Sequence, residues 1–209
     1  EPHPFTIHDM LAMERISDPQ ISPDGTKVVF TLRTTDLEAN RGRTDLWLMD
    51  LDGENLRRLT SDPAGDWNPR WCLNGHLFFL STRSGSSQIW TIDPTGGEAT
   101  QVSDLPLDVG NLEVAPERRA FLFTMDVYPG LTVAETVARD AEIAADPATG
   151  RVYDELLFRH WDTWEDGKRS HVFVMEGPDA EPVDLMIDLA ADTPTFPWGG
   201  REELSLIPI

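Results

Sequence analysis

The chain of 209 residues contains a single cysteine, Cys72. One cysteine excludes an internal disulfide and argues against a metal site built from thiolates. Because Cys72 lies inside a strand-like apolar segment, we expect a buried packing residue there. The histidines show no metal-ligand spacing either, so the sequence predicts no metal and no cofactor. They are His3, His8, His76, His160 and His171.

Basic residues are also few. Lys and Arg together number 17 against 37 for Asp and Glu, which gives a formal net charge of −20. A surface this negative repels phosphate backbones. The composition therefore argues against nucleic acid as a partner.

Long apolar runs and catalytic motifs are missing as well. No run of about 18 apolar residues is present, so no transmembrane helix is expected. The opening "EPHPFTIHDM" (1–10) lacks the basic start and apolar stretch of a signal peptide. The sequence has no G-x-S-x-G nucleophile elbow, H-E-x-x-H motif, P-loop or dinucleotide-binding glycine pattern. We therefore expect no peptide hydrolysis by this chain alone.

What the sequence does contain is a repeat. The segments "DPQISPDGTKVVF" (18–30), "NPRWCLNGHLFFL" (68–80) and "NLEVAPERRAFLF" (111–123) each combine a short strand, a turn and an apolar strand. Gly25 and Gly75 stand where such a turn requires positive φ. The third segment has Glu117-Arg118 at the turn, so a different turn is expected there.

A second repeated element follows each of these hairpins. It carries an aromatic residue on a strand of alternating polarity, and the three aromatic positions are Trp47, Trp90 and Phe173. The first two are 43 residues apart, within the roughly 40–45 residues of a four-stranded propeller blade. The next interval is 83 residues, which indicates an insertion of about forty residues in the third unit.

These repeats predict an all-β fold, namely an incomplete β-propeller. It would have three four-stranded blades, the start of a fourth, and a helical insertion in the third blade. A β-sandwich built from similar hairpins is the alternative. The predicted domain spans 1–209. Its blades cover about 17–62, about 66–105 and about 109–190, with the insertion at about 128–169 and the fourth blade starting at about 192–209.

Propellers usually close with about four to eight blades. Three blades and a start of a fourth would leave an open edge and an exposed apolar face. We therefore expect the chain to be a fragment, or the ring to be completed by other segments.

The third unit holds the one helix-rich stretch, "LTVAETVARDAEIAAD" (131–146). Thr132 and Glu135 have the spacing of a capping box, and Asp146-Pro147 ends the helix. Its apolar residues form no wide face, so we expect a surface helix.

The segment "RVYDELLFRHWDTWEDGKRSH" (151–171) has the densest collection of charged and aromatic residues in the chain. One interpretation is structural: Arg159 neutralises Asp154 or Asp162, and the tryptophans cover the blade. The other is functional: a long loop on a rigid scaffold presents carboxylates to a cationic group. The residues alone favour the structural interpretation slightly.

Three segments carry a resemblance to a known family. "FTIHDMLAMERISDPQISPDGTKVVFTL" (5–32) resembles the start of the propeller domain in the prolyl oligopeptidase family of serine peptidases. "STRSGSSQIWTIDPTGGEATQVS" (81–103) is similar to the second blade of its acylaminoacyl-peptidase and dipeptidyl-peptidase branch, which includes the bacterial dipeptidyl peptidase V type. "YDELLFRHWDTWEDGKRSHVFV" (153–174) is similar to an insertion found in that branch.

The resemblance implies a role in an exopeptidase. In that family the N-terminal propeller gates and orients peptide substrates for a C-terminal α/β-hydrolase domain with a Ser-Asp-His triad, which this sequence lacks. In the dipeptidyl-peptidase members, acidic residues on a propeller insertion bind the free α-amino group of the substrate. On this basis Asp154 and Glu155 are the candidates for that role, and Arg159 would orient them or hold a substrate carbonyl. Trp161 and Asp162 complete the set of candidate substrate-binding residues.

A different class of function stays open, namely a stand-alone TolB-like propeller that acts as a protein-interaction scaffold. The expected partners of the peptidase are the peptide N-terminus and the hydrolase domain, with a homodimer as one option. The resemblance favours a periplasmic or secreted bacterial protein, and the cytoplasm is the alternative.

Overall fold

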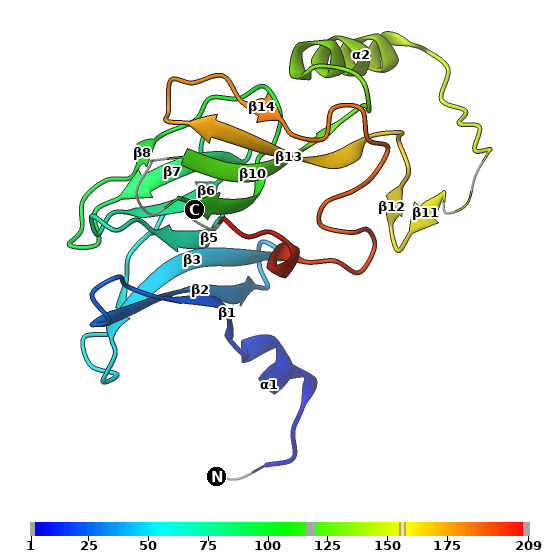
Figure 1. Ribbon diagram of the computed structural model, residues 1–209. Helices are drawn as coiled ribbons and strands as arrows, with labels where there is room; N and C mark the ends of the chain where they lie inside the picture. The colour runs from blue at the N-terminus through cyan, green and yellow to red at the C-terminus, as the bar shows by residue number, and fades with distance from the viewer. Residues whose placement is uncertain (1–2, 116–119, 155, 157, 207–209) are drawn as a thin grey trace. The chain divides into compact units, whose positions relative to one another are not determined.

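The computed structural model describes residues 3–115, 120–154, 156 and 158–206, and its strands form three four-stranded sheets and one two-stranded hairpin (Figure 1). The first sheet has the order β1-β2-β3-β4, the second β5-β6-β7-β8 and the third β14-β13-β10-β9. The strands of the first two sheets are β1 (Arg15–Ile21), β2 (Lys27–Asp36), β3 (Arg41–Asp50), β4 (Arg57–Arg58), β5 (Asp66–Trp71), β6 (Leu77–Ser81), β7 (Gln88–Ile92) and β8 (Thr100–Gln101). Those of the third sheet are β9 (Gly110–Val114), β10 (Ala120–Val127), β13 (Arg169–Glu176) and β14 (Val183–Asp184).

The chain divides into two units. The first comprises Glu1–Asp104 with Val114–Arg119, and the second comprises Leu105–Glu113 with Ala120–Ile209. The first two sheets belong to the first unit. The third sheet belongs to the second unit, apart from the last residue of β9.

The same strand pairing recurs in all three sheets. The second strand pairs antiparallel with the third, and the aromatic residue of the third strand lies opposite a phenylalanine of the second. The pairs are Phe30 with Trp47, Phe79 with Trp90, and Phe123 with Phe173. The periodicity found in the sequence thus corresponds to one register repeated three times.

The turns between the first two strands also recur. In the first sheet the Gly25 amide donates to the Ser22 carbonyl at 2.9 Å, and in the second the Gly75 amide donates to the Cys72 carbonyl at 2.9 Å. Both glycines have positive φ, +71° and +83°, which explains why glycine stands there. The corresponding turn of the third sheet, Glu117-Arg118, lies outside the described residues. Cys72 is buried, as its place in the sequence predicts.

A further repeated feature lies in the first strand of each sheet. Asp18, Asn68 and Asn111 all adopt positive φ, between 47° and 57°. The pairing of β1 with β2 and of β5 with β6 shifts register at the first two of these positions, so each of these strands carries a bulge. Asp and Asn tolerate this conformation better than other non-glycine residues.

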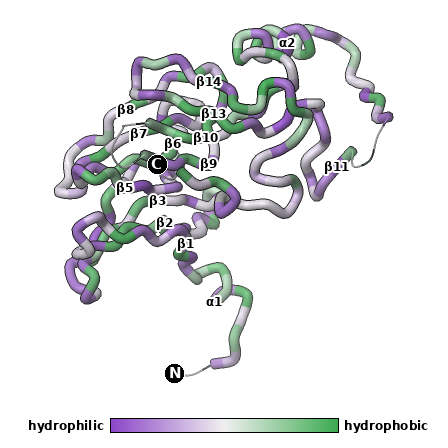
Figure 2. The backbone as a smooth tube through the Cα atoms, in the orientation of Figure 1, coloured by the Kyte–Doolittle hydropathy of each residue, from purple (hydrophilic) through white to green (hydrophobic). Residues whose placement is uncertain are grey.

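An apolar layer joins the first two sheets within the first unit. Strand β5 packs against β1, β2 and β3. The buried side chains of this layer are Val29, Leu46, Leu48, Leu77, Phe79 and Ile92. Figure 2 shows the hydrophobic stretches that run along central strands such as β6.

An ion pair and a hydrogen bond connect the bulged strands β1 and β5 of these two sheets. The Arg70 guanidinium donates to the Asp18 carboxylate at 2.8 Å, and these side chains are only 6% and 12% exposed. The Trp71 indole N–H donates to the Gln20 carbonyl at 3.1 Å. Removing one member of a buried ion pair is costly, because the other charge then stays buried without its counter-charge.

The helices and the small hairpin lie outside the sheets. Helix α1 (Ile7–Ala12) precedes β1. Helix α2 (Val133–Ala145) follows β10, and its N-terminus has the capping box of Thr132 and Glu135. Its residues are mostly exposed, with Thr136 alone buried among its described side chains. The hairpin of β11 (Arg159–His160) and β12 (Thr163–Trp164) comes next in the chain.

The segment after β14 folds back onto the third sheet. The Thr193 amide donates to the Ser170 carbonyl of β13 at 2.8 Å. After the short 3-10 helix η1 (Arg201–Glu203), Leu204 packs against Leu122 and Val172. No strand follows β14 within the described residues.

We expect the Arg70→Met variant to lose about 3 to 5 kcal/mol of unfolding free energy, because the Asp18 carboxylate would stay buried without the guanidinium charge, with the Gln20 amide still donating to it. The measurement is chemical denaturation at neutral pH. The control is Arg139→Ala, which removes an exposed arginine paired with exposed Glu142 on α2. Equal losses in the two variants would contradict the role given to the buried pair.

Candidate acidic binding site

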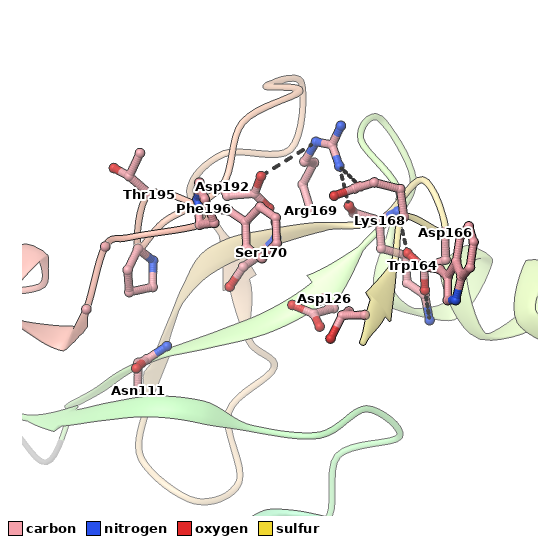
Figure 3. Close-up of a pocket in the computed structure, with 16 residues that line it drawn as sticks. Asn111, Asp126, Trp164, Asp166, Lys168, Arg169, Ser170, Asp192, Thr195 and Phe196 are labelled. Atoms are coloured by element: carbon pink, nitrogen blue, oxygen red, sulfur yellow. Dashed lines mark hydrogen bonds and ion pairs between the residues drawn. The ribbon is translucent and has the colours of Figure 1, made fainter. Parts of the chain in front are cut away.

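A cavity of about 330 Å³ opens in the second unit at the end of β10. Its wall comes from β10, from the turn between β12 and β13, and from the loop that follows β14 (Figure 3). The charged residues that line it are Asp126, Glu165, Asp166, Lys168, Arg169 and Asp192. Four carboxylates therefore face two basic side chains, and the lining has an excess of negative charge.

Strand pairing explains why these distant residues meet. In the register of β10 with β13, Asp126 lies opposite Ser170, and its neighbour Val127 lies opposite Arg169. The Ser170 amide in turn donates to the Asp192 carboxylate at 3.0 Å. Asp126 and Asp192 therefore both lie next to Ser170 of β13.

The two basic residues are already engaged. The Arg169 guanidinium donates to Glu165 at 2.8 Å and lies 3.7 Å from Asp192 (Figure 3). The Lys168 ammonium donates to Asp140 of α2 at 3.0 Å and lies 3.7 Å from Asp166. Burial alone would lower the pKa of Lys168, but the hydrogen bond with Asp140 and the charge of Asp166 outweigh it and raise that pKa.

Asp126 differs from the other acids of the cavity. Within the described part of the chain, its carboxylate has no hydrogen-bond or ion-pair partner, and it remains accessible to solvent from the cavity side. The walls displace much of the surrounding water, so burial raises the pKa of Asp126 above its ordinary value. The charge of Asp166, and to a lesser extent that of Asp192, raises this pKa further, against the opposing effect of Lys168. Lys168 and Arg169 are engaged with other carboxylates, and within the described residues neither forms an ion pair with Asp126.

A second, wider cavity of about 820 Å³ adjoins the first. The two share part of their lining, namely Glu165, Asp166, Arg169, Asp192, Phe196 and Pro197. The wider cavity extends to α2 and to the segment that begins at Arg151.

The candidates from the sequence are spread over this region. Asp154 is exposed and lines the wider cavity, whereas Glu155 lies outside the described residues. Arg159 places its guanidinium 4.9 Å from the centre of the Trp164 ring, and no ion pair joins it to Asp154 or Asp162 in the described structure. This contact differs from the neutralising role that one interpretation gave it.

The other two candidates are exposed and line neither described cavity. Trp161 is 78% exposed, so it does not cover a sheet. Its φ is +50°, and its ring lies 6.0 Å from that of His160. Asp162 is also exposed. The assignment of Asp154, Glu155, Arg159, Trp161 and Asp162 to substrate binding stays a prediction.

The sequence reasoning missed Asp126 and Asp192. The available signal was the carboxylate that interrupts the apolar strand "AFLFTMDV" (120–127). Asp192 gives no local signal, because it lies in a Pro-rich segment whose sequence predicts the start of another blade.

No group of three or more His, Cys, Asp or Glu side chains among the described residues is arranged to hold a metal ion. No helix in this part of the chain is long and apolar enough to cross a membrane.

Comparison with known families gives one match over more than half of the chain. The family model described as "TolB beta propeller domain" matches residues 12–135. The match covers the first two sheets and continues through β9, β10 and the start of α2.

Known proteins of two kinds are similar to the chain. Dipeptidyl-peptidase 5 of Porphyromonas gingivalis is 28% identical over 202 residues, which is 95% of this chain. The chain spans only 29% of the length of that relative. The Tol-Pal system protein TolB of Anaeromyxobacter dehalogenans is 46% identical over 50 residues, 24% of this chain and 10% of TolB.

Among solved structures, an acylaminoacyl peptidase in complex with Z-Gly-Gly-Phe-chloromethyl ketone has a similar fold. Its TM-score is 0.61 at 15% sequence identity, and the match covers 84% of this chain and 26% of that one. At this identity the likeness concerns the fold alone.

We expect Asp126→Asn to stabilise the protein at neutral pH and not below the ordinary Asp pKa of 3.8. A raised pKa means that the folded protein holds this proton more tightly than the unfolded chain. The ionised carboxylate therefore costs stability once the pH rises through the raised pKa, and the amide avoids that cost. Urea denaturation between pH 3 and 8 measures the difference.

The control for this experiment is Asp179→Asn, which changes an exposed carboxylate at the β13–β14 turn. Its difference from the wild type should show no such rise with pH. A stabilisation by Asp126→Asn that was independent of pH would contradict the explanation.

Proposed function

Because the chain belongs to the family of the TolB beta propeller domain, we propose that it forms the N-terminal propeller part of a serine exopeptidase. The type would be a dipeptidyl peptidase or an acylaminoacyl peptidase. The similarity to dipeptidyl-peptidase 5 along 95% of the chain supports this choice. In this proposal the three sheets are successive blades, about 17–62, about 66–105 and about 109–190. The part with α2 and β11–β12 is an insertion of the third blade.

The proposed role of the chain is to bind and orient the substrate. A C-terminal α/β-hydrolase domain of the same protein would supply the catalytic triad. The protein would act in the periplasm or outside the cell, in line with the resemblance on which the peptidase assignment rests.

The acidic cavity would bind the α-ammonium group of a peptide. The observation that carries this proposal is the Asp126 carboxylate, which has no partner within the described structure although it stands among other acids. An ammonium group there would form charge-assisted hydrogen bonds and relieve the repulsion between Asp126, Asp166 and Asp192. Glu165 is already paired with Arg169, so it is not one of the acids assigned to the ammonium group.

The candidates from the sequence fit around this site. Asp154 would add a carboxylate on the wall of the adjoining cavity, and Glu155 follows it directly in the chain. Arg159 and Trp161 would contact parts of the substrate farther from its N-terminus, and so would Asp162.

A scaffold role is the second candidate. The 46% identity with a TolB over 50 residues favours it. A scaffold would need no cation in the acidic cavity, so the two functions differ in what happens when a peptide ammonium is offered.

In the full-length protein, we expect Asp126→Asn to raise KM about tenfold to hundredfold for dipeptidyl substrates with a free amine. The amide keeps the size of the side chain but removes the charge that attracts the ammonium group. Substrates with an acetylated amine should show little change. Steady-state kinetics with paired free and acetylated substrates makes the measurement, and Asp179→Asn is the control. Equal KM values for Asp126→Asn and wild type with the free amine would refute the role of the cavity.

Asp154→Asn should also raise KM for free-amine substrates, but less than Asp126→Asn, because Asp154 lines only the adjoining cavity. The double variant Asp154→Asn/Glu155→Gln tests the original pair of candidates. If that double variant had the KM of wild type, Asp154 and Glu155 would have no part in binding the amine.

A further inference from the structure

The wider cavity has a wall of a different character from the acidic one. Apolar side chains from three places face it: Ile143 of α2, the segment with Val152, Leu156 and Phe158, and Phe196 of the loop after β14. Val152 is 87% exposed and Leu156 is 86% exposed. These side chains offer apolar surface that the described structure does not bury.

An aromatic cluster stiffens this wall. The Tyr153 ring centre lies 5.6 Å from that of Phe158 and 5.9 Å from that of Trp164, and the latter two are 6.1 Å apart. The Trp164 ring stacks on those of Tyr153 and Phe158, whereas Tyr153 and Phe158 are tilted to one another. Aromatic rings at these separations attract one another, so the three side chains hold one another in place.

The hydroxyl of Tyr153 is the second observation. The residue lines the wider cavity, and its hydroxyl oxygen is buried without a hydrogen-bond partner in the described structure. A buried hydroxyl without a partner is unfavourable, and a ligand group in the cavity could provide the missing bond.

The opposite wall is anchored by polar contacts. Tyr128 donates its hydroxyl to Asp140 of α2 at 3.1 Å, and its amide donates to the Thr136 hydroxyl at 3.3 Å. Lys168 holds Asp140 as well, from the turn that lines the acidic cavity. Helix α2 is therefore tied to the same turn that forms the acidic site.

We propose that the wider cavity binds the apolar side chain of the residue whose ammonium group occupies the acidic cavity, an inference that rests on the proposed function. The cavities adjoin along Phe196 and Asp192, so one amino-acid residue can place its charge in one and its side chain in the other. Tyr153 donates its hydroxyl to a carbonyl of the same peptide. The protein thus selects peptides with a large apolar N-terminal residue.

Four dipeptide amides test this inference by titration calorimetry on the full-length protein with the nucleophilic serine of its hydrolase domain replaced by alanine, so that the ligands bind without being cleaved. They are Leu-Ala amide, Asn-Ala amide and the N-acetyl form of each. Leucine and asparagine have similar shapes and differ mainly in polarity. We expect Leu-Ala amide to bind about tenfold more tightly than Asn-Ala amide.

The outcomes separate this inference from the proposed function. If acetylation abolishes binding but leucine and asparagine bind equally, the apolar selection is wrong and ammonium binding stands. If acetylation has no effect while leucine is still preferred, ammonium binding is wrong and the apolar cavity stands.

Two variants test whether the wider cavity produces the preference for leucine over asparagine. Val152→Ser should reduce the preference for leucine, and its exposed position makes misfolding a minor concern. The matched control is Val183→Ser on β14, which is 56% exposed and lines neither described cavity. An equal loss of preference in both variants would overturn the assignment of the cavity.

Tyr153→Phe separates binding from folding. Removal of the buried hydroxyl should stabilise the free protein in thermal denaturation. The same change should weaken binding of Leu-Ala amide about fivefold, because the ligand carbonyl loses its donor. Unchanged or tighter binding would overturn the role of the hydroxyl.

Discussion

The antiparallel pairing of the second strand with the third is the contact on which the rest of each sheet depends. It places an aromatic pair at its centre in all three sheets, and in the third sheet Phe123 and Phe173 stack with ring centres 6.1 Å apart. Three positions beyond that pair, the same register sets Asp126 opposite Ser170. The apolar core and the acidic cavity are therefore consequences of one register, and a shift by one residue would lose both.

The strand pairing could be predicted from the sequence because its signals are local. Alternation of polarity, a glycine at each described turn and a recurring aromatic residue each involve neighbours in the chain, and together they predicted the paired strands and the burial of Cys72. The bulges at Asp18 and Asn68, and the positive φ of Asn111, could not be predicted because positive φ at Asp or Asn has only a weak sequence signal. Their importance lies in contacts such as that of Asp18 with Arg70, which are remote in the chain.

The acidic site could not be predicted from the sequence in the same way. Its acids come from β10, from the turn before β13 and from the loop after β14, and only pairing across the sheet brings Asp126 and Asp192 together. The dense segment 151–171 drew attention to Asp154 and its neighbours because their charges are adjacent in sequence. Local density identified the region, but an unbalanced charge such as that of Asp126 can be recognised only when its spatial neighbours are known.

The excess of negative charge has a proposed chemical purpose at one place on the molecule. Most of the acidic residues need no explanation beyond solubility, whereas Asp126 lines a cavity with three other carboxylates and makes no ion pair within the described structure. The most direct test is a crystal structure of the protein with Leu-Ala amide. We predict that the peptide ammonium group lies within hydrogen-bond distance of Asp126. A peptide bound with its ammonium group away from the cavity that Asp126 and Asp192 line would contradict it.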